Sequence, residues 1–351
     1  MITPASAIIH LNQLERNLSN IQSQLGDGVE IIFVIKSDAY GLGLVPVAKR
    51  AANFGLKCFA VVSLNDAKTL REAGITQDIL LLVEPTESEL PDLIEYSLIP
   101  TLYTADRISQ LNALATQAIS VHLKVNTGMN RLGCSIDDAP ALYQSIQEAE
   151  NLKLSGIYSH FSMVNHPFAQ TQLARFQSVL DTLNPARDVI RHIGNSEAAK
   201  TLIPAHFDAV RIGLAAYENM LEIQAPVIAV RHVAKGEPVG YNCEYFAPQD
   251  TQIATVHIGY ADGLPSLLQA PAHVLIHGER YPIVGPVCMD LILVDLGPSP
   301  QPIAQVGDRA CILGTQGSQS ISVNDWVQSS GLNPRAISHG FSIRLPRQYK
   351  D

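Results

Sequence analysis

The stretch IIFVIKSDAYGLGLVPVAKRAANFGLKCFAVV (residues 31–62) contains the pattern that decides the fold class. Its two ends, residues 31–35 and 58–62, are short apolar runs rich in β-branched side chains, and residues 45–55 between them have helical character. Apolar strands that alternate with helices are typical of a parallel sheet with both faces covered. Further apolar runs of this kind follow at residues 79–83, 100–103, 121–125, 154–158, 189–193 and 209–212. Eight such units predict an α/β fold, an N-terminal (β/α)8 TIM-like barrel.

Beyond about residue 222 the pattern changes, because helical spacing disappears and short strand-like runs follow one another. These runs are 225–230, 251–260, 272–285, 291–296, 309–314 and 320–323. They predict a C-terminal mostly-β domain over residues 223–351, after a barrel domain over residues 1–222. At the start of the chain, residues 8–22 predict a strand entering a helix, with Asn12 as its N-cap and Glu15 at the capping-box position.

The composition limits the class of protein and its partners. Only 16% of the 351 residues are charged against 46% hydrophobic, which excludes intrinsic disorder. The net charge is -9 and no basic run occurs, which argues against nucleic acid as a partner. Five scattered cysteines without a CxxC pair indicate a reducing compartment and no zinc site. The chain shows no signal peptide and no apolar run of about 20 residues, so we expect a cytoplasmic protein without a membrane partner.

Chemistry in a barrel enzyme lies at the carboxyl ends of the strands, and Lys36 directly follows the run 31–35. A lysine in apolar surroundings is suited to Schiff-base chemistry with a carbonyl cofactor, although a solvated lysine at a strand end is the commoner case. Residues 194–196 form a polar turn before a helix, and residues 211–214 place a cation beside a glycine. Such loops commonly bind phosphate in barrels, and ordinary turn chemistry is the alternative. A lysine and an anion site together suggest pyridoxal phosphate.

Three other positions are candidates for the site. Lys124 lies within the apolar run 121–125, where an unpaired ammonium is costly, so it needs a partner or a modification. His160 follows the run 154–158 and could orient a cofactor ring, or could be a satisfied core histidine. Residues 257–263 place Tyr260 beside two glycines, which alone indicates a turn. Serine-hydrolase and nucleotide-binding motifs are incomplete, and no HExxH zinc motif occurs.

The chain resembles the alanine racemases over nearly its whole length. The segments that carry the resemblance are VIKSDAYGLG (34–43), HLKVNTGMNRLG (122–133), GIYSHF (156–161), GNSEAA (194–199), VRIGLAAY (210–217), HIGYADG (257–263) and PIVGPVCMD (282–290). GYADG and VCMD discriminate best, because barrel proteins with the same cofactor and other activities share only the lysine region. The resemblance implies pyridoxal 5′-phosphate as cofactor and an amino acid as small-molecule substrate.

The resemblance also implies roles for individual residues. Lys36 matches the lysine that holds the cofactor covalently and acts as one acid/base, and Tyr260 matches the other. Arg211 matches the arginine at the pyridine nitrogen, and His160 matches the residue beside the ring. The matches to the remaining cofactor-binding positions, chiefly around the phosphate, are Tyr40, Asn195, Ser196, Gly213 and Leu214. No metal is implied.

Further implications concern the substrate and the assembly. Lys124 is similar to a lysine that is N-carbamylated in many members, and the carbamate would pair with Arg131. Arg131 and the backbone of Met289 correspond to substrate-binding positions. In the family, Tyr260 and Met289 reach the site from the other subunit, so a homodimer with shared active sites is implied. A large dimer interface would also account for the low charge.

The expected activity is interconversion of L- and D-alanine by two-base proton transfer at Cα, supplying D-alanine for peptidoglycan. The alternatives are a racemase of serine or of a broader set of amino acids, and a non-catalytic protein that binds the cofactor. Some positions depart from the family pattern: Asp38, Leu42, Asn126, Asn130, Glu218, Pro286 and Arg335, the last at the usual place of a phosphate-binding tyrosine.

Overall fold

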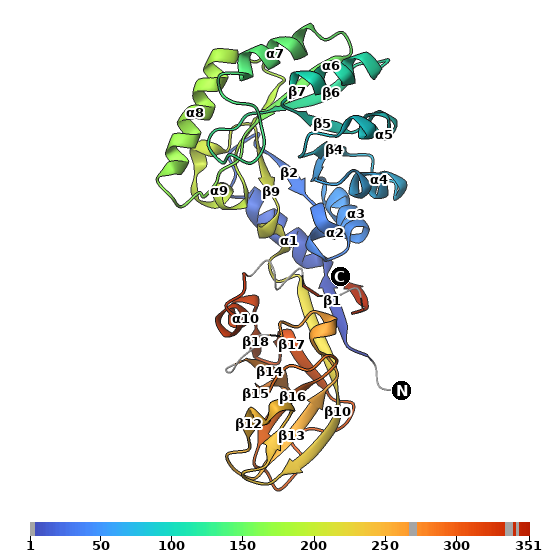
Figure 1. Ribbon diagram of the computed structural model, residues 1–351, viewed down its shortest axis with the longest axis vertical. Coiled ribbons are helices and arrows are strands. Elements are labelled where there is room, and N and C mark those ends of the chain that lie inside the picture. The colour runs from blue at the N-terminus through green and yellow to red at the C-terminus, as the bar shows by residue number, and fades with distance from the viewer. Residues whose placement is uncertain (1–3, 267–271, 334–339, 342–343) are drawn as a thin grey trace. The chain divides into compact units, whose positions relative to one another are not determined.

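A computed structural model describes residues 4–266, 272–333, 340–341 and 344–351 (Figure 1). Contacts within the chain define two compact units. The barrel unit comprises Gln13–Ala39 and Gly43–Glu218. The β-unit comprises the described residues up to Asn12, Tyr40–Leu42 and the described residues from Asn219 onward. Each unit is described by itself, and the domain boundary between residues 222 and 223 stays a prediction.

The barrel unit is built on eight parallel strands in the order β8-β7-β6-β5-β4-β3-β2-β9. Their bounds are β2 Glu30–Val34, β3 Cys58–Val61, β4 Asp78–Leu81, β5 Ile99–Leu102, β6 Ile119–Lys124, β7 Leu152–Tyr158, β8 Ile190–His192 and β9 Ala209–Ile212. The two strands at the ends of this order, β8 and β9, approach each other. The backbone N–H of Arg211 on β9 donates to the carbonyl of Gly194, just after β8, at 2.9 Å. All eight strands coincide with predicted apolar runs, so the TIM-like barrel is confirmed.

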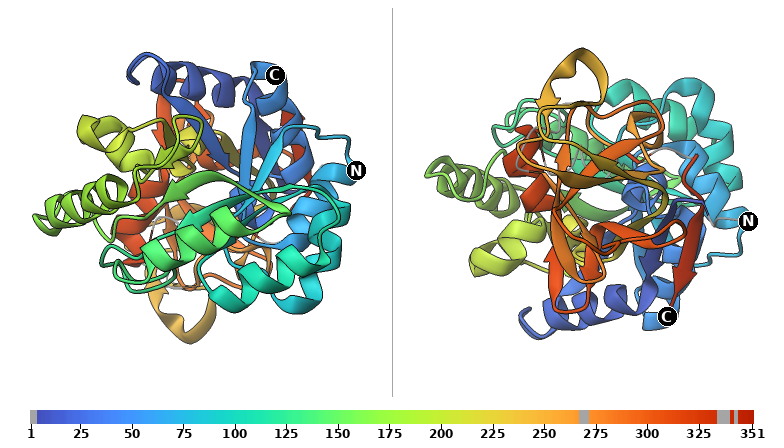
Figure 2. Two further views of the ribbon diagram at one scale, coloured as in Figure 1. Left: turned by 90° about the horizontal axis from the view of Figure 1, so that it is seen from above. Right: turned by 90° about the horizontal axis from the view of Figure 1, so that it is seen from below.

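Helices surround the barrel strands, as Figure 2 shows. They are α1 Leu11–Gln22, α3 Leu44–Phe54, α4 Leu64–Glu72, α5 Leu90–Glu95, α6 Ala105–Leu114, α7 Ala139–Glu148, α8 Phe168–Leu183 and α9 Ser196–Thr201. Each longer helix buries one apolar stripe; in α1 the stripe is Leu14, Leu18 and Ile21, at spacings of four and three residues. Since α1 follows directly on the preceding strand and begins at Leu11, Asn12 lies inside its first turn, and the predicted N-cap is wrong.

The β-unit is a mostly antiparallel sheet, which confirms the predicted mostly-β domain. Its main strands are β10 Leu221–Val233, β13 Thr251–Val256, β14 His273–Ile276, β15 Glu279–Val284, β16 Ile292–Gly297 and β17 Arg309–Gln316. They follow the order β17-β14-β15-β16-β13-β10, and β17 also pairs with β10, so the pairings form a closed ring. Smaller strands are β11 Pro238–Val239, β12 Tyr245–Phe246 and β18 Gln319–Ile321.

Two features of the β-unit differ from expectation. The first strand, β1 (Ser6–His10), pairs with β10 and with the last strand, β19 (Arg347–Lys350), and not with the barrel. The predicted strand 320–323 is wrong at its end, because β18 stops at Ile321 and a helix, α10 (Val323–Ser330), begins. Ser322 and Asp325 form a reciprocal capping box there, which fixes the start of the helix. Within the described ranges, no helix is long and apolar enough to cross a membrane.

Candidate active site

The centre of the site is Arg211, a guanidinium on β9 that is only 4% exposed. Its Nη1 donates to the Nδ1 and the carbonyl of His192, at 2.7 and 3.2 Å. Its Nη2 donates to the carbonyls of Ser159 and Ile193, at 2.7 and 3.1 Å. These acceptors lie at the carboxyl ends of β7 and β8, so three adjacent strands hold one side chain. A buried cation needs such a set of hydrogen bonds.

His160, just after β7, also faces this guanidinium, and its Nδ1 lies 2.9 Å from Nη2. Because arginine has only donors, Nδ1 must accept in both His160 and His192, and each ring then carries its proton on Nε2. Burial first, and the positive charge of Arg211 second, hold the pKa of both histidines well below the usual range. On the far side of His192, Nε2 donates to His122 Nδ1 at 3.0 Å. These histidines are therefore neutral acceptors that leave the proton on arginine.

Arg211 has one guanidinium N–H group, at Nε, that is not used in the hydrogen bonds described above. Its printed hydrogen bonds all leave from Nη1 and Nη2, and among the described residues its Nε–H makes none. No carboxylate of the described chain forms an ion pair with it. Burial lowers its pKa to about 10, so the group stays protonated at neutral pH. The geometry offers a buried cation whose spare N–H suits a ligand atom with a lone pair.

Further cations gather near Arg211. Lys124, at the end of β6, is 6% exposed, and its Nζ donates to the Leu82 carbonyl at 3.2 Å. Burial, and then the positive charges of Arg211, Arg131 and Lys36, lower the pKa of Lys124 to about 7. Lys124 makes no ion pair within the described part of the chain. The predicted residues Lys36, Lys124, Arg131, His160 and Arg211 thus share one electropositive region, which favours an anionic ligand.

A small cavity opens in this region. Lys124, Arg131, Ser159 and His160 contribute to its wall, together with Met129. The loop that carries Arg131 is closed by a polar pair, because Asn126 Nδ2 donates to Asn130 Oδ1 at 2.9 Å. Asn130 has a φ of 57°, a left-handed conformation that asparagine tolerates better than most residues. The paired asparagines therefore stabilise the turn that leads to Arg131.

Lys36 begins a strained segment, α2 (Lys36–Tyr40), in which the residues after it have left-handed φ values of 52–57°. Left-handed turns of non-glycine residues are costly and concentrate at functional sites. Two carboxylates stabilise the turn at Lys36–Tyr40. Asp66 accepts from the Ser37 N–H at 3.2 Å, and Asp38 Oδ1 accepts from the Leu44 N–H at 2.7 Å. The predicted residue Tyr40 ends the turn. Sequence patterns gave no signal for this conformation.

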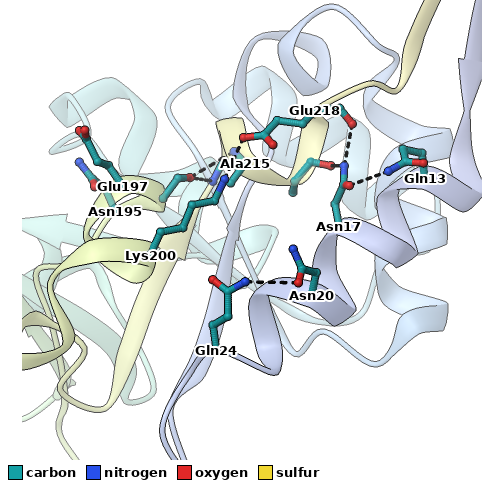
Figure 3. A network of polar contacts seen from close by, with 12 residues as sticks. Gln13, Asn17, Asn20, Gln24, Asn195, Glu197, Lys200, Ala215 and Glu218 are labelled. Atoms are coloured by element: carbon teal, nitrogen blue, oxygen red, sulfur yellow. Dashed lines mark hydrogen bonds and ion pairs between the residues drawn. The ribbon is translucent and has the colours of Figure 1, made fainter. Parts of the chain in front are cut away.

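The loops after β8 and β9, which we call the cradle, carry the residues expected to bind phosphate, and polar contacts join them (Figure 3). Asn195 caps α9, because its Oδ1 accepts from the N–H groups of Glu197 and Ala198 at 3.0 Å each. Ser196 Oγ accepts from the Gly213 N–H at 3.0 Å, which joins the two loops. Leu214 follows at the start of a short 3-10 turn, Leu214–Tyr217. The structure thus brings together the four residues predicted for this cradle in the barrel unit.

Three contacts that the sequence did not predict involve residues next to the cradle (Figure 3). Asn17 on α1 donates through Nδ2 to the carbonyls of Ala216 and Glu218, at 2.9 and 2.8 Å. Lys200 on α9 pairs with Glu218 at 3.0 Å. Glu218 is one of the positions expected to depart from the family pattern, and its carboxylate makes this ion pair.

In the β-unit, Tyr260 and Met289 lie side by side. The Tyr260 N–H donates to the Cys288 carbonyl at 3.1 Å, and the Ala261 N–H donates to the Met289 carbonyl at 2.9 Å. A side chain at Gly259 would place Cβ 2.3 Å from these carbonyls, so only glycine permits the contact. The side chains of Tyr260 and Met289 are 44% and 54% exposed. Arg335, the remaining departure of interest, lies outside the described residues.

The fold and the site define a barrel enzyme with a C-terminal β-unit, whose cationic site lies at the carboxyl ends of the barrel strands. Family models described as "Alanine racemase, N-terminal domain" and "Alanine racemase, C-terminal domain" match residues 9–219 and 220–349. The chain belongs to the alanine racemase family, and the resemblance is confirmed.

Individual relatives agree with this assignment. An alanine racemase of Halothermothrix orenii is 33% identical and aligns over 99% of this chain and 97% of its own. The crystal structure of alanine racemase from E. faecalis is 29% identical, with a TM-score of 0.93 and full coverage of both chains. The Bacillus anthracis enzyme with bound L-Ala-P is 29% identical, with a TM-score of 0.88 over 100% of this chain and 96% of that chain.

Proposed function

We propose that this protein is a pyridoxal 5′-phosphate-dependent racemase that interconverts L- and D-alanine. The observation that carries the proposal is Arg211, a buried cation held by neutral acceptors, with one N–H left to donate. Family membership supports alanine as the substrate, and the relative crystallised with L-Ala-P supports a site for an alanine-like group. No other part of the described chain combines a buried cation, a strained lysine turn and a phosphate cradle.

The residues present fit the cofactor. Lys36 would hold it covalently, Arg211 would donate through Nε to its pyridine nitrogen, and the loops at Ser196 and Gly213 would take its phosphate, with His160 beside the ring. When bound, this cofactor withdraws electrons from the substrate and makes its Cα–H acidic. The electropositive surroundings of Lys124 and Arg131 suit both the phenolic oxygen of the cofactor and the substrate carboxylate.

Arg211 sets the selectivity of the reaction. With a pKa of about 10 it keeps its proton at neutral pH, so it would donate a hydrogen bond to the pyridine nitrogen of a bound cofactor without giving up the proton. By leaving that nitrogen unprotonated, Arg211 would favour return of the proton to Cα over competing reactions. His160 and His192 support this role, because as neutral acceptors they add no proton of their own.

Two groups must move the proton, because racemisation removes it from one face of Cα and returns one to the opposite face. We assign Lys36 Nζ to one face and Tyr260 Oη to the other. Each accepts a proton in one direction of the reaction and donates it in the reverse direction. Lys36 stands on a turn held by Asp66 and Asp38, and Tyr260 stands on a loop fixed by backbone hydrogen bonds.

We further propose that the active enzyme is a homodimer in which the partner subunit's Tyr260 and the partner subunit's Met289 complete each site. The large exposed fractions of these two side chains support this arrangement. The charged fraction of only 16% is also consistent with a surface that is covered by a second copy.

Lys124 is proposed to carry an N-carbamate. A pKa of about 7 leaves a substantial neutral fraction at physiological pH, and only a neutral amine attacks CO₂. The nitrogen forms a bond to the CO₂ carbon and releases a proton, so a buried cation becomes an anion. That anion would pair with Arg131 and relieve the repulsion among the neighbouring cations.

The cellular role that we propose is the supply of D-alanine for peptidoglycan in the cytoplasm. The free state of all five cysteines supports a reducing compartment. Broader specificity is a second candidate, because Asn126 and Asn130 alter the loop that carries Arg131.

The test is to incubate the purified protein with its cofactor and with L-alanine, L-serine and larger L-amino acids in turn. We expect D-alanine to form fastest. A higher rate with serine would favour the second candidate, whereas a protein with bound cofactor that forms no D-amino acid would be a cofactor-binding protein without racemase activity.

A further inference from the structure

Gln172, on α8 (Phe168–Leu183), is a fully buried polar side chain whose role neither the motifs nor the proposed mechanism explains. Its Oε1 accepts from both the backbone N–H and the hydroxyl of Ser162, at 2.9 Å each. Its Nε2 donates to the His160 carbonyl at 3.0 Å and to Thr127 Oγ1 at 3.4 Å. The amide therefore uses both its acceptor and its donor capacity, as a buried polar group requires.

These bonds converge on the two loops that carry the proposed site. His160 and Ser162 lie just after β7, and Gln172 fixes the backbone on both sides of Phe161. Thr127 lies just after β6, in the loop that leads to Arg131, and its hydroxyl is also 2.7 Å from Ser159 Oγ. One side chain from a helix thus joins both loops and holds the carbonyl of the histidine that faces Arg211.

A second glutamine on the same helix, Gln177, provides a comparison because it lies on the exposed face. Gln177 is exposed, and its Nε2 donates to Asp181 one turn further along α8, at 2.8 Å. It contacts no loop of the site through this bond. An apolar side chain at Gln172 would instead leave the Ser162 N–H and the His160 carbonyl without their partner in the interior.

We propose that Gln172 is a positioning residue for racemisation, which acts by holding His160 so that its Nδ1 stays against the Arg211 guanidinium. The inference rests on the proposed function, since it assigns His160 and Arg211 to the cofactor. Loss of the Gln172 bonds lets the loop shift, and small shifts at a reacting centre reduce turnover strongly.

The experiment compares Gln172→Met with Gln177→Met in the holoenzyme, at saturating cofactor. Met has nearly the volume of Gln and removes every hydrogen bond. For Gln172→Met we expect kcat to fall about ten- to hundred-fold while KM for alanine changes little, and for Gln177→Met we expect no change. If the two variants behave alike while the wild-type protein racemises alanine, the inference is wrong. If the wild-type protein itself forms no D-amino acid, the proposed function fails instead.

A double-mutant cycle separates positioning from general stability. In a His160→Asn background, the further change Gln172→Met should lower kcat by less than about threefold, because the residue through which it acts is already altered. Equal losses in both backgrounds would overturn the proposal. Should Gln172→Met fail to fold, Gln172→Glu is the alternative variant. It keeps the side-chain volume and an acceptor for Ser162 but replaces the donor to His160. A wild-type kcat in that variant at neutral pH would also overturn the proposal.

Discussion

The barrel unit and the β-unit present their proposed catalytic groups in opposite ways. In the barrel unit, Arg211 is buried, and both side-chain and backbone acceptors on the neighbouring strands hold its guanidinium. In the β-unit, backbone bonds fix the loops, and the side chains of Tyr260 and Met289 extend into solvent. The difference indicates that contacts within the barrel unit set the charge and protonation state of its site, whereas the two side chains of the β-unit stay exposed in the single chain.

The strongest test of this contrast combines two inactive variants. Lys36→Ala removes the proposed acid/base and cofactor anchor of the barrel unit, and Tyr260→Phe removes the proposed acid/base of the β-unit, so we expect losses of about 10²- to 10⁴-fold for each alone. If sites are shared between subunits, mixing the two variants by co-refolding restores about a quarter of wild-type activity. Half of the dimers are then mixed, and each of these holds one intact site.

Tyr281→Phe, which removes a hydroxyl from β15 of the same unit, is the matched control and should retain full activity. No recovery on mixing, with mixed dimers shown to form by a tag on one variant, would place both bases of a site in one chain. The exposure of Tyr260 and Met289 in the β-unit would then not reflect a site shared between subunits.

A smaller loss of activity is expected when Lys124, the buried lysine of the barrel unit, is changed. Its pKa of about 7 predicts that protein depleted of CO₂ regains activity with bicarbonate readily above pH 7 and poorly below it, since protonation blocks the attack on CO₂. Lys124→Met should lower activity about tenfold and abolish the bicarbonate response. Mass spectrometry without a carbamate in bicarbonate buffer would contradict the assignment.

The same pKa has a consequence for stability when Lys124 is unmodified. The lysine binds its proton less readily in the folded chain than in the unfolded one, whose pKa is near 10.5. The unfolded state therefore binds more protons between about pH 7 and pH 10.5, and the free energy of unfolding rises with pH across that window. Lys124→Met should flatten this rise in denaturant titrations of CO₂-depleted protein.

The smallest effect concerns the support of the cradle. Asn17→Asp keeps the shape of the side chain but turns its donor towards the Ala216 and Glu218 carbonyls into an acceptor, so we expect cofactor affinity to fall about three- to tenfold. At saturating cofactor, kcat should stay near wild type. Asn20→Asp, one turn away on α1 with a side chain that accepts from Gln24, is the control. A change in kcat without a change in cofactor affinity would exclude a role through the cradle.

The sequence predicted the barrel well because its strands are buried on both faces and appear as plain apolar runs. It could not assign β1 to the β-unit, since SAIIH has the same composition as a barrel strand and its partners lie far along the chain. Lys36, Lys124 and Arg211 were predicted from their positions in or beside the apolar runs, and Arg131 from the family resemblance. The left-handed turn after Lys36 and the role of Gln172 were not, because each depends on long-range contacts, to Asp66 and to His160, that local pattern does not encode.

The pairing of β1 with β19 also constrains how the chain is made. Ala7 lies opposite Arg347 in this parallel pair, so β1 waits for a partner that lies 340 residues further along the chain. The barrel strands can assemble during synthesis, whereas β1 gains this partner only after Arg347–Lys350 have emerged. Until then β1 presents an unpaired edge of apolar residues, a surface on which nascent chains aggregate and which chaperones recognise.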